Sequence, residues 1–368
     1  MGWNSWNWHG KKDITEKIVE ETMDAMVREG LRDAGYVYVV VDGGWRDTKL
    51  SPKGELLAHP AKFPSGIKHL ADYAHARGLK FGVHSVPGTH DCGGDAVGGF
   101  GREEVHLKQF VDWGLDFVKL DKCRYEPGWT EPRVKATYAK WATLLAHSGR
   151  DIVFSISAYE FRGWYPEVCH MARTTYDIAA RIHQTRAIFD DDTPRDNFLS
   201  VMQCAEINNR AAAAGGNGYW NDAEMMVTGE QGLTAEEQKA HFALWCIMSA
   251  PLILGNDPRH MTAAEKAIVL NREAIAVDQA PTEQGRRVRV DGKTEIWVKR
   301  LHGNRAAVLL LNRDPKAARP ITLRAEDVGV KGRANLRDVF GQRDLGTLDG
   351  TFTKSTPPHA GWFLVVSP

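Results

Sequence analysis

The sequence has no run of about 18 apolar residues, which a membrane-spanning helix would need. It has no excess of either charge, because its 47 basic and 47 acidic residues balance without forming a block of like charge. These two absences give no basis for a membrane partner or for electrostatic attraction to nucleic acid. Only five cysteines occur, which are too few and too scattered for a disulfide scaffold or a zinc cluster, although one or two bridges remain possible.

Several short motifs are missing as well. No GxGxxG follows an early predicted strand, which disfavours a doubly wound nucleotide-binding fold. No His-x-x-x-His or Cys-x-x-Cys spacing stands at a strand end, so we predict no metal site. The first ten residues, MGWNSWNWHG, do not combine a basic flank, an apolar region and a cleavage site, and so do not predict a signal peptide. A leader removed before Met1 remains an alternative.

The first three quarters of the chain alternate short apolar runs with longer amphipathic segments. One amphipathic segment spans 14–29, with Asp13 as the expected N-cap and Glu16 completing a capping box. Two others span 102–113 and 234–249. Eight alternations over about 270 residues are typical of a (β/α)8 barrel. We expect its strands at 2–6, 36–41, 80–84, 117–120, 152–156, 172–176, 218–221 and 251–254.

After about residue 280 the pattern changes to strand-like pieces separated by turn residues, without helices. A length of 368 residues also favours one large domain with a smaller one. We therefore predict a (β/α)8 TIM barrel at 1–278, followed by a C-terminal antiparallel β-sandwich domain at 279–368. The predicted strands of the second domain are 287–290, 294–300, 305–312, 321–323 and 361–366.

Polar and aromatic residues gather where the predicted barrel strands end, which is the face that carries active sites in such barrels. Carboxylates can accept hydrogen bonds from sugar hydroxyls, and indole rings can pack on a sugar's apolar face. Two carboxylates about 5 Å apart can cleave a glycosidic bond with retention, one as nucleophile and one as acid/base, without a cofactor. The residues at these strand ends are Trp3, Asn4, Ser5, Trp6, Asp42, Trp45, His84, Lys119, Asp121, Ser155, Ser157, Arg173, Asp177, Trp220, Asn221 and Asp222.

Each of these residues also has a structural interpretation. Asp42 could be a helix N-cap or a turn former. Asp121 and Lys119 could form a structural ion pair, and at least one N-terminal tryptophan is expected to fill the core. The functional interpretation rests on the convergence of such residues from seven strands.

The motifs MGWNSW, VVVDGGW, DWGLDFVKLDKC, ARTTYDI and YWNDAEMM occur in an order and spacing that resemble glycoside hydrolase family 27. This family contains α-galactosidases and α-N-acetylgalactosaminidases, and HPAKFPSGIKHLADYAHARGLKFGVH and LWCIMSAPLILGNDPRHM extend the resemblance. It implies a (β/α)8 barrel with a following β domain, and a retaining double displacement. Asp121 matches the nucleophile and Asp177 the acid/base. Cys92 and Cys123 match a pair that is disulfide-bonded in members from oxidising compartments.

The resemblance also implies a substrate pocket. Lys119 matches a lysine that contacts sugar hydroxyls, Arg173 an arginine near the 2-position, and Trp6 an aromatic wall. Asp42 matches the first of two adjacent carboxylates that hold hydroxyls at the far end of the sugar. The complete set of expected substrate-binding residues is Trp6, Asp42, His84, Lys119, Ser157, Arg173 and Asp222.

The chain departs from the family pattern within this pocket. Gly43 stands where a second aspartate is usual, which removes hydrogen bonds of roughly 1.5 to 3 kcal/mol. His84 replaces a frequent tyrosine, and SISAYEF lacks the common glutamate and tryptophan. Ser157 resembles the N-acetylgalactosaminidases, whereas Glu160 does not.

These departures leave more than one substrate open. We expect hydrolysis of terminal α-D-galactosyl residues from an oligosaccharide or glycoconjugate. The alternatives are an α-N-acetylgalactosaminide, a β-L-arabinopyranoside, an α-1,6-glucan, or a sugar-binding barrel without catalysis. We expect a secreted or periplasmic protein, no cofactor, and no nucleic-acid or membrane partner, with the oligomeric state open.

Overall fold

The computed structural model describes residues 1–123, 129–183, 185–191, 198–330 and 332–368. The chain divides into two compact units, and each is described by itself. The first comprises Met1–Thr174, Ile182–Gln184 and Ile253–His260, and the second comprises Thr175–Arg181, Thr185–Leu252 and Met261–Pro368.

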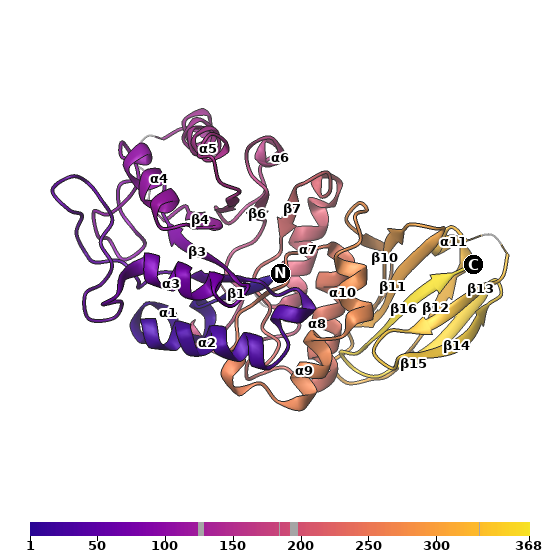
Figure 1. The fold of residues 1–368 in the computed structure, drawn as a ribbon. Helices are drawn as coiled ribbons and strands as arrows, with labels where there is room; N and C mark the ends of the chain where they lie inside the picture. The colour runs from indigo at the N-terminus through magenta and orange to yellow at the C-terminus, as the bar shows by residue number, and fades with distance from the viewer. Residues whose placement is uncertain (124–128, 184, 192–197, 331) are drawn as a thin grey trace. The chain divides into compact units, whose positions relative to one another are not determined.

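The predicted (β/α)8 barrel is confirmed: the chain forms a curled eight-stranded parallel sheet in the order β7-β6-β5-β4-β3-β2-β1-β8. Helices such as α2, α3 and α4 flank the strands of the first unit (Figure 1). The predictions for β1 and β6 extended too far, since these strands end at Asn4 and Arg173. The eight strands are β1 (Gly2–Asn4), β2 (Tyr38–Val41), β3 (Lys80–Ser85), β4 (Phe117–Asp121), β5 (Val153–Ser157), β6 (Met171–Arg173), β7 (Trp220–Asp222) and β8 (Ile253–Leu254).

The predicted cap at Asp13 is wrong. Asp13 is the last residue of α1, and α2 begins after Thr15, whose hydroxyl accepts a hydrogen bond from Ile18 N–H at 3.3 Å. Thr15 takes the extended backbone of an N-cap, so it holds the position instead. The helices are α1 (Trp6–Asp13), α2 (Glu16–Arg28), α3 (Gly66–His75), α4 (Glu103–Asp112), α5 (Glu131–Ala146), α6 (Tyr165–Val168), α7 (Val201–Arg210), α8 (Ala235–Met248), α9 (Ala263–Val269), α10 (Arg272–Asp278) and α11 (Ala325–Val328).

The C-terminal part is antiparallel, as predicted. The expected absence of helices there is wrong, because the short helix α11 lies between β12 and β13. A six-stranded sheet has the order β14-β13-β16-β11-β10-β9, and β12 pairs with β15 in a second sheet. Apolar residues such as Val308, Leu310, Leu323 and Leu364 form the core of this domain. Its strands are β9 (Arg286–Asp291), β10 (Thr294–Leu301), β11 (Arg305–Asn312), β12 (Arg319–Arg324), β13 (Ala334–Asp338), β14 (Arg343–Leu348), β15 (Thr351–Thr356) and β16 (Gly361–Ser367).

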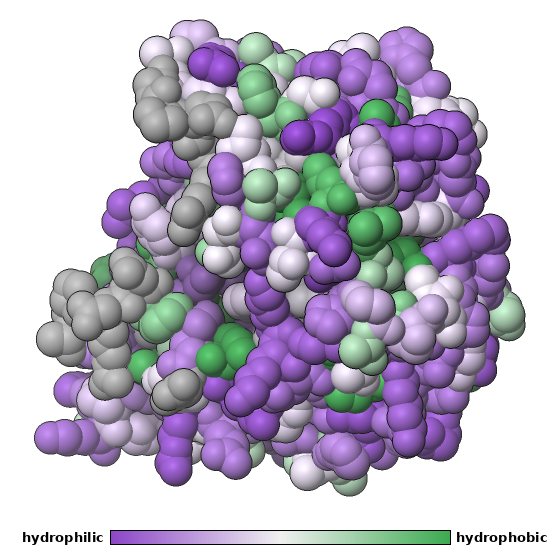
Figure 2. Space-filling view, turned by 90° about the vertical axis from the view of Figure 1, so that its left-hand side faces the viewer, coloured by the Kyte–Doolittle hydropathy of each residue, from purple (hydrophilic) through white to green (hydrophobic). Residues whose placement is uncertain are grey.

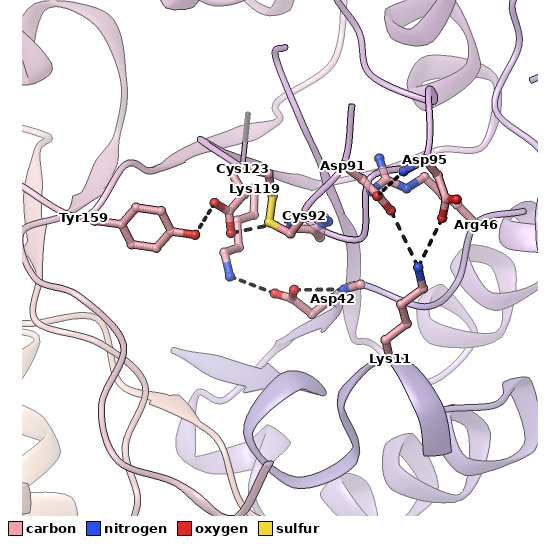
Figure 3. The surroundings of a disulfide bond; sticks show 12 residues. Lys11, Asp42, Arg46, Asp91, Cys92, Asp95, Lys119, Cys123 and Tyr159 are labelled. Carbon is pink, nitrogen blue, oxygen red and sulfur yellow. Dashed lines mark hydrogen bonds and ion pairs between the residues drawn. A yellow bond between two sulfur atoms is a disulfide. The ribbon is translucent and has the colours of Figure 1, made fainter. Parts of the chain in front are cut away.

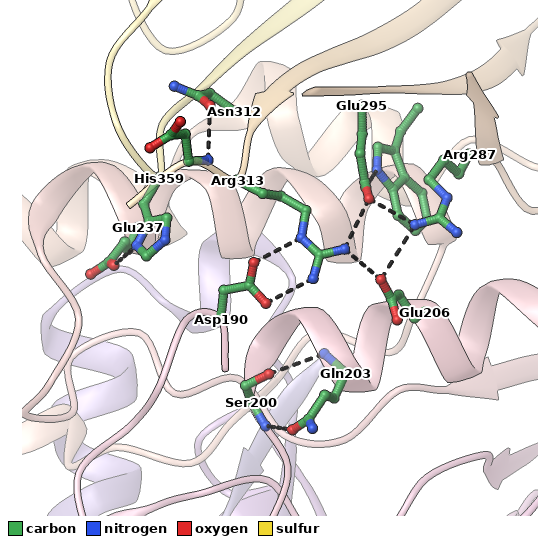
Figure 4. Close-up of polar contacts among 12 residues, drawn as sticks. Asp190, Ser200, Gln203, Glu206, Glu237, Arg287, Glu295, Asn312, Arg313 and His359 are labelled. Carbon is green, nitrogen blue, oxygen red and sulfur yellow. Dashed lines mark hydrogen bonds and ion pairs between the residues drawn. The ribbon is translucent and has the colours of Figure 1, made fainter. Parts of the chain in front are cut away.

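A charged cluster joins the C-terminal strands to α7 within the second unit (Figure 4). The Arg313 guanidinium donates two hydrogen bonds of 2.8 Å to the Asp190 carboxylate and also contacts Glu206 and Glu295. Glu295 accepts a further hydrogen bond from Arg287 at 2.7 Å. These partly buried, multidentate ion pairs stabilise the unit more than isolated surface pairs would.

The surface is mainly hydrophilic on the face that Figure 2 shows, and apolar side chains appear there only in small groups. Among the helices that the structure describes, none combines the length and the apolar composition required to span a membrane.

Candidate active site

Side chains from adjacent strands meet at the carboxyl end of the sheet in the first unit. In the strand register His84 of β3 pairs with Lys119 of β4, and Asp121 pairs with Ser157 of β5. Asp42 follows β2 directly. Because the strands are parallel, their carboxyl ends lie together, and this register gathers the polar residues on one rim of the sheet.

Asp42 is held by the protein on both carboxylate oxygens. Lys119 Nζ and Asn4 Nδ2 donate to its Oδ2 at 2.8 and 2.9 Å, and Gly43 N–H donates to its Oδ1 at 2.8 Å. Burial raises the pKa of Asp42, but the Lys119 ammonium and His84 outweigh burial and lower it strongly overall. Burial likewise lowers the pKa of Lys119, yet the Asp42 and Asp121 carboxylates raise it overall. The 2.8 Å distance between Lys119 Nζ and Asp42 Oδ2 makes Asp42, and not Asp121, the direct ion-pair partner of Lys119.

Asp121 lies at the end of β4 with 7% of its surface exposed. Tyr159 Oη donates a 2.7 Å hydrogen bond to Asp121 Oδ1, and His84 Nε2 lies 3.6 Å from Oδ2. Burial raises the pKa of Asp121, while His84, Lys119 and Tyr159 together lower it below its usual value. Figure 3 shows the Tyr159 ring directed at this strand end. These three contacts favour the charged form of the Asp121 carboxylate.

Trp6 lies beside Gly43 and occupies space that a side chain at this position would need. Its backbone N–H donates to Asn4 Oδ1 at 2.8 Å, which fixes the turn from β1 into α1. A Cβ added to Gly43 would approach Trp6 Cζ3 to 3.1 Å, tighter than ordinary van der Waals contact. Trp3, in contrast, is fully buried and donates from Nε1 to Asn256 O at 2.7 Å, so it is a core residue.

The disulfide expected between Cys92 and Cys123 is present. It ties the end of β4, two residues beyond Asp121, to the loop that follows β3. The same loop is held by Lys11 Nζ, which lies 3.1 Å from the Asp95 carboxylate (Figure 3). The other three cysteines, Cys169, Cys204 and Cys246, are buried.

The remaining predicted residues lie in two places. In the first unit Arg173 is 3% exposed with its guanidinium 5.9 Å from the Tyr159 ring centroid, and Ser157 is fully buried. Asp177 and Asp222 belong to the second unit. The backbone carbonyl of Asp177 accepts from Leu199 N–H at 2.9 Å, and Asp222 Oδ1 accepts from Glu224 N–H at 2.9 Å.

Two groups of described side chains come close enough together to consider as metal ligands. His84, Asp121 and Cys123 offer atoms within 4.8 Å of one another, but the Cys123 sulfur is bonded to Cys92 and cannot act as a thiolate. The other group, Glu16, Glu20 and His69, lies on α2 and α3, away from the site. Neither group assigns a metal to the site.

Comparisons with known proteins agree with this architecture. Residues 4–280 match the family described as "Alpha galactosidase A", and residues 291–366 match the "Alpha galactosidase C-terminal beta sandwich domain". The chain is 36% identical over 366 residues to alpha-galactosidase 2 of Arabidopsis thaliana, which covers 98% of this chain and 87% of that protein.

Solved structures give the same result. The crystal structure of α-galactosidase I from Mortierella vinacea superposes with a TM-score of 0.92 at 30% identity, covering 100% of this chain and 96% of that one. A β-L-arabinopyranosidase from Geobacillus stearothermophilus has a TM-score of 0.85 at 22% identity, covering 100% and 96% of the two chains, and is similar in fold.

Proposed function

Because this chain belongs to glycoside hydrolase family 27, the α-galactosidase family, we propose that it is a retaining exo-glycosidase that hydrolyses terminal α-D-galactosyl residues. The observation that supports this most directly is the buried carboxylate of Asp121, held between Tyr159 and His84 at the end of β4, with a pKa below its usual value. The substrate would be an oligosaccharide or a glycoconjugate.

The reaction would proceed in two displacements. Asp121 attacks the anomeric carbon while the bond to the leaving oxygen breaks, and Asp177 gives that oxygen a proton. Asp177, now a carboxylate, removes a proton from water, and the water oxygen displaces Asp121 from the anomeric carbon. Asp177 regains its proton and Asp121 its charge, so both residues return to their initial states and the configuration is retained.

The other pocket residues would bind the sugar. Lys119 and Asp42, already paired with each other, offer a cation and an acceptor to neighbouring hydroxyls, and Trp6 supplies an apolar wall. His84, Ser157, Arg173 and Asp222 stay predicted sugar contacts on the basis of the family resemblance. Asp42 Oδ2 accepts two hydrogen bonds from the protein and Oδ1 one, so Oδ1 keeps one lone pair for substrate.

Hydrolysis of a panel of nitrophenyl glycosides tests the proposal. We expect turnover of the α-galactoside, with the α-anomer of galactose as the first product in a proton NMR time course. Initial release of the β-anomer would contradict the retaining mechanism. An intact glycoside after days of incubation across the panel would instead favour the sugar-binding barrel without catalysis.

The absence of a side chain at Gly43, with Trp6 close to the space that one would fill, favours β-L-arabinopyranosides as a second candidate substrate. This sugar resembles galactose but lacks the hydroxymethyl group at C5. Because Gly43 stands where a second aspartate is usual, the pocket offers fewer acceptors for the 4- and 6-hydroxyls. Galactose would bury a 6-hydroxyl without an acceptor in such a pocket, whereas arabinopyranose has no 6-hydroxyl and avoids this cost.

Substitution of Gly43 measures this preference. We expect Gly43→Asp to raise the ratio of kcat/KM for α-galactoside over β-L-arabinopyranoside by about tenfold, the value of one charge-assisted hydrogen bond. Trp6 must shift by a few tenths of an ångström to admit the side chain. Gly43→Asn is the matched control, since it has the same shape without the charge. An equal ratio in the two variants would show that shape alone, and not the carboxylate, sets the preference.

We further propose that the protein is secreted or periplasmic. The Cys92–Cys123 disulfide supports this, because disulfides persist in oxidising compartments. We keep the proposed domain limits of 1–278 for the barrel and 279–368 for the β domain.

A further inference from the structure

Tyr159 lies outside the pattern that identified the other pocket residues, yet its side chain makes a direct hydrogen bond to Asp121. Its hydroxyl donates to Asp121 Oδ1 at 2.7 Å, whereas His84 Nε2 stays 3.6 Å from Oδ2. The two oxygens of the carboxylate are therefore unequal. Oδ1 accepts a hydrogen bond from the neutral Tyr159 hydroxyl. Oδ2 lies farther from His84 than a hydrogen bond allows.

The backbone at Tyr159 is held in an unusual conformation. Its φ of +65° is in the left-handed region, which residues with a Cβ rarely adopt. The Tyr159 side chain has a second contact, because the Arg173 guanidinium lies over the phenol ring, 5.9 Å from its centroid. Such a conformation persists only where surrounding contacts hold it, and here it places the hydroxyl on the proposed nucleophile.

We propose that Tyr159 is a positioning residue that orients Asp121 for attack through Oδ2 and speeds the release of the sugar from the covalent intermediate. This inference rests on the proposed function. In the first displacement the Oδ2–C1 bond forms, and Oδ1 becomes the carbonyl oxygen of an ester that still accepts from Tyr159. In the second, water attacks C1, the C1–Oδ2 bond breaks, and its electron pair returns to the carboxylate.

The direction of the effect follows from hydrogen-bond strength. A donor binds a charged carboxylate more strongly than a neutral ester carbonyl. Tyr159 therefore stabilises Asp121 as a leaving group more than it stabilises the ester, and its loss slows the second displacement more than the first. A residue that merely supported the fold would slow both steps together.

Tyr159→Phe tests this proposal, because it removes the hydroxyl and keeps the ring beside Arg173. A dinitrophenyl glycoside of the sugar that the wild type turns over makes the second displacement rate-limiting. We expect kcat to fall about tenfold while kcat/KM changes by no more than about threefold. KM then falls, and rapid mixing shows a burst of dinitrophenol.

The pH profile gives a second readout. Among the described residues, the charged and titratable groups near Asp121 and Tyr159 are His84, Lys119, Arg173 and, at longer range, Arg46, and all remain in Tyr159→Phe. Loss of the donated hydrogen bond should move the acid limb of kcat/KM to higher pH, because the pKa of Asp121 is held low partly by this bond.

The matched control is Tyr73→Phe, which removes another tyrosine hydroxyl that donates to an aspartate, Asp24, at 3.0 Å between α3 and α2. It should leave kcat, kcat/KM and the pH profile unchanged. Equal falls in kcat and kcat/KM in Tyr159→Phe, or no change in either, would overturn the inference while the wild-type activity stands. Absence of wild-type turnover on every sugar of the panel would instead contradict the proposed function and the inference together.

Discussion

Asp121→Gly is expected to lower the hydrolysis of nitrophenyl α-galactoside by a factor on the order of 10⁴ or more, because the covalent route is lost. The cavity left by the side chain lies next to the anomeric carbon in the proposed mechanism. A small anion such as azide can enter it and attack that carbon directly. We therefore expect azide to restore release of nitrophenol and to give β-galactosyl azide, with one inversion in place of two.

Asp177→Ala provides the comparison for Asp121→Gly. The acid/base matters most where the leaving oxygen needs a proton, so this variant should keep much of its activity on dinitrophenyl α-galactoside and lose it on an alkyl or sugar α-galactoside. Recovery of an α-azide with Asp121→Gly would contradict the assignment of that residue as nucleophile. A loss in Asp177→Ala that does not depend on the leaving group would contradict the acid/base assignment.

The barrel could be predicted because its buried strands are short apolar runs separated by amphipathic helices. Strands β13, β14 and β15 escaped prediction. The residues of β14 and β15 are mostly exposed, with little apolar alternation, and their pairing with β13 and β12 decides their conformation. The cap at Thr15 was missed because Asp and Thr are both common N-cap residues. Only the backbone conformation shows that Thr15 caps α2 and that Asp13 still belongs to α1.

The sequence predicts which residue types stand at the strand ends of the candidate site. It does not predict which of these side chains contact each other. Sequence spacing suggested Lys119 with Asp121, because they lie two residues apart on one strand, whereas the lysine reaches across the sheet to Asp42. Tyr159 gave no signal, since its role depends on a left-handed backbone that nothing in SISAYEF requires. Such contacts depend on tertiary packing and cannot be read from local pattern.

The Lys119–Asp42 pair also makes a prediction about stability. Lys119→Met keeps the length of the side chain and leaves the Asp42 carboxylate buried without its cation. Removing one partner of a buried pair costs about 3 to 5 kcal/mol of unfolding free energy at pH 7. Denaturant titration measures this loss. Lys80→Met is the control, because Lys80 is exposed and its Nζ lies 3.4 Å from Tyr38 Oη, so its loss should change stability by no more than about 0.5 kcal/mol.

The pH dependence of this loss has a definite sign. In the wild type the pKa of Asp42 is lowered and that of Lys119 is raised. The pair therefore stabilises the fold fully between about pH 4 and pH 10, the unfolded-state values of the two groups. Its contribution falls as the pH drops toward the folded pKa of Asp42, or rises toward that of Lys119. In Lys119→Met burial is no longer offset by the ammonium, so the pKa of Asp42 should rise and protonation should relieve the penalty at mildly acidic pH.

The double variant Asp42→Asn with Lys119→Met separates a buried charge from a lost contact. The neutral amide has the same shape and avoids the cost of an unpaired carboxylate, so the double variant should be more stable than Lys119→Met alone at pH 7. The difference between the two should shrink as the pH falls, because Asp42 becomes neutral in the single variant. Equal stability at pH 7 would mean that Asp42 does not depend on Lys119 for its charge. Both variants should lose hydrolysis, since each removes a group that we assign to the sugar hydroxyls.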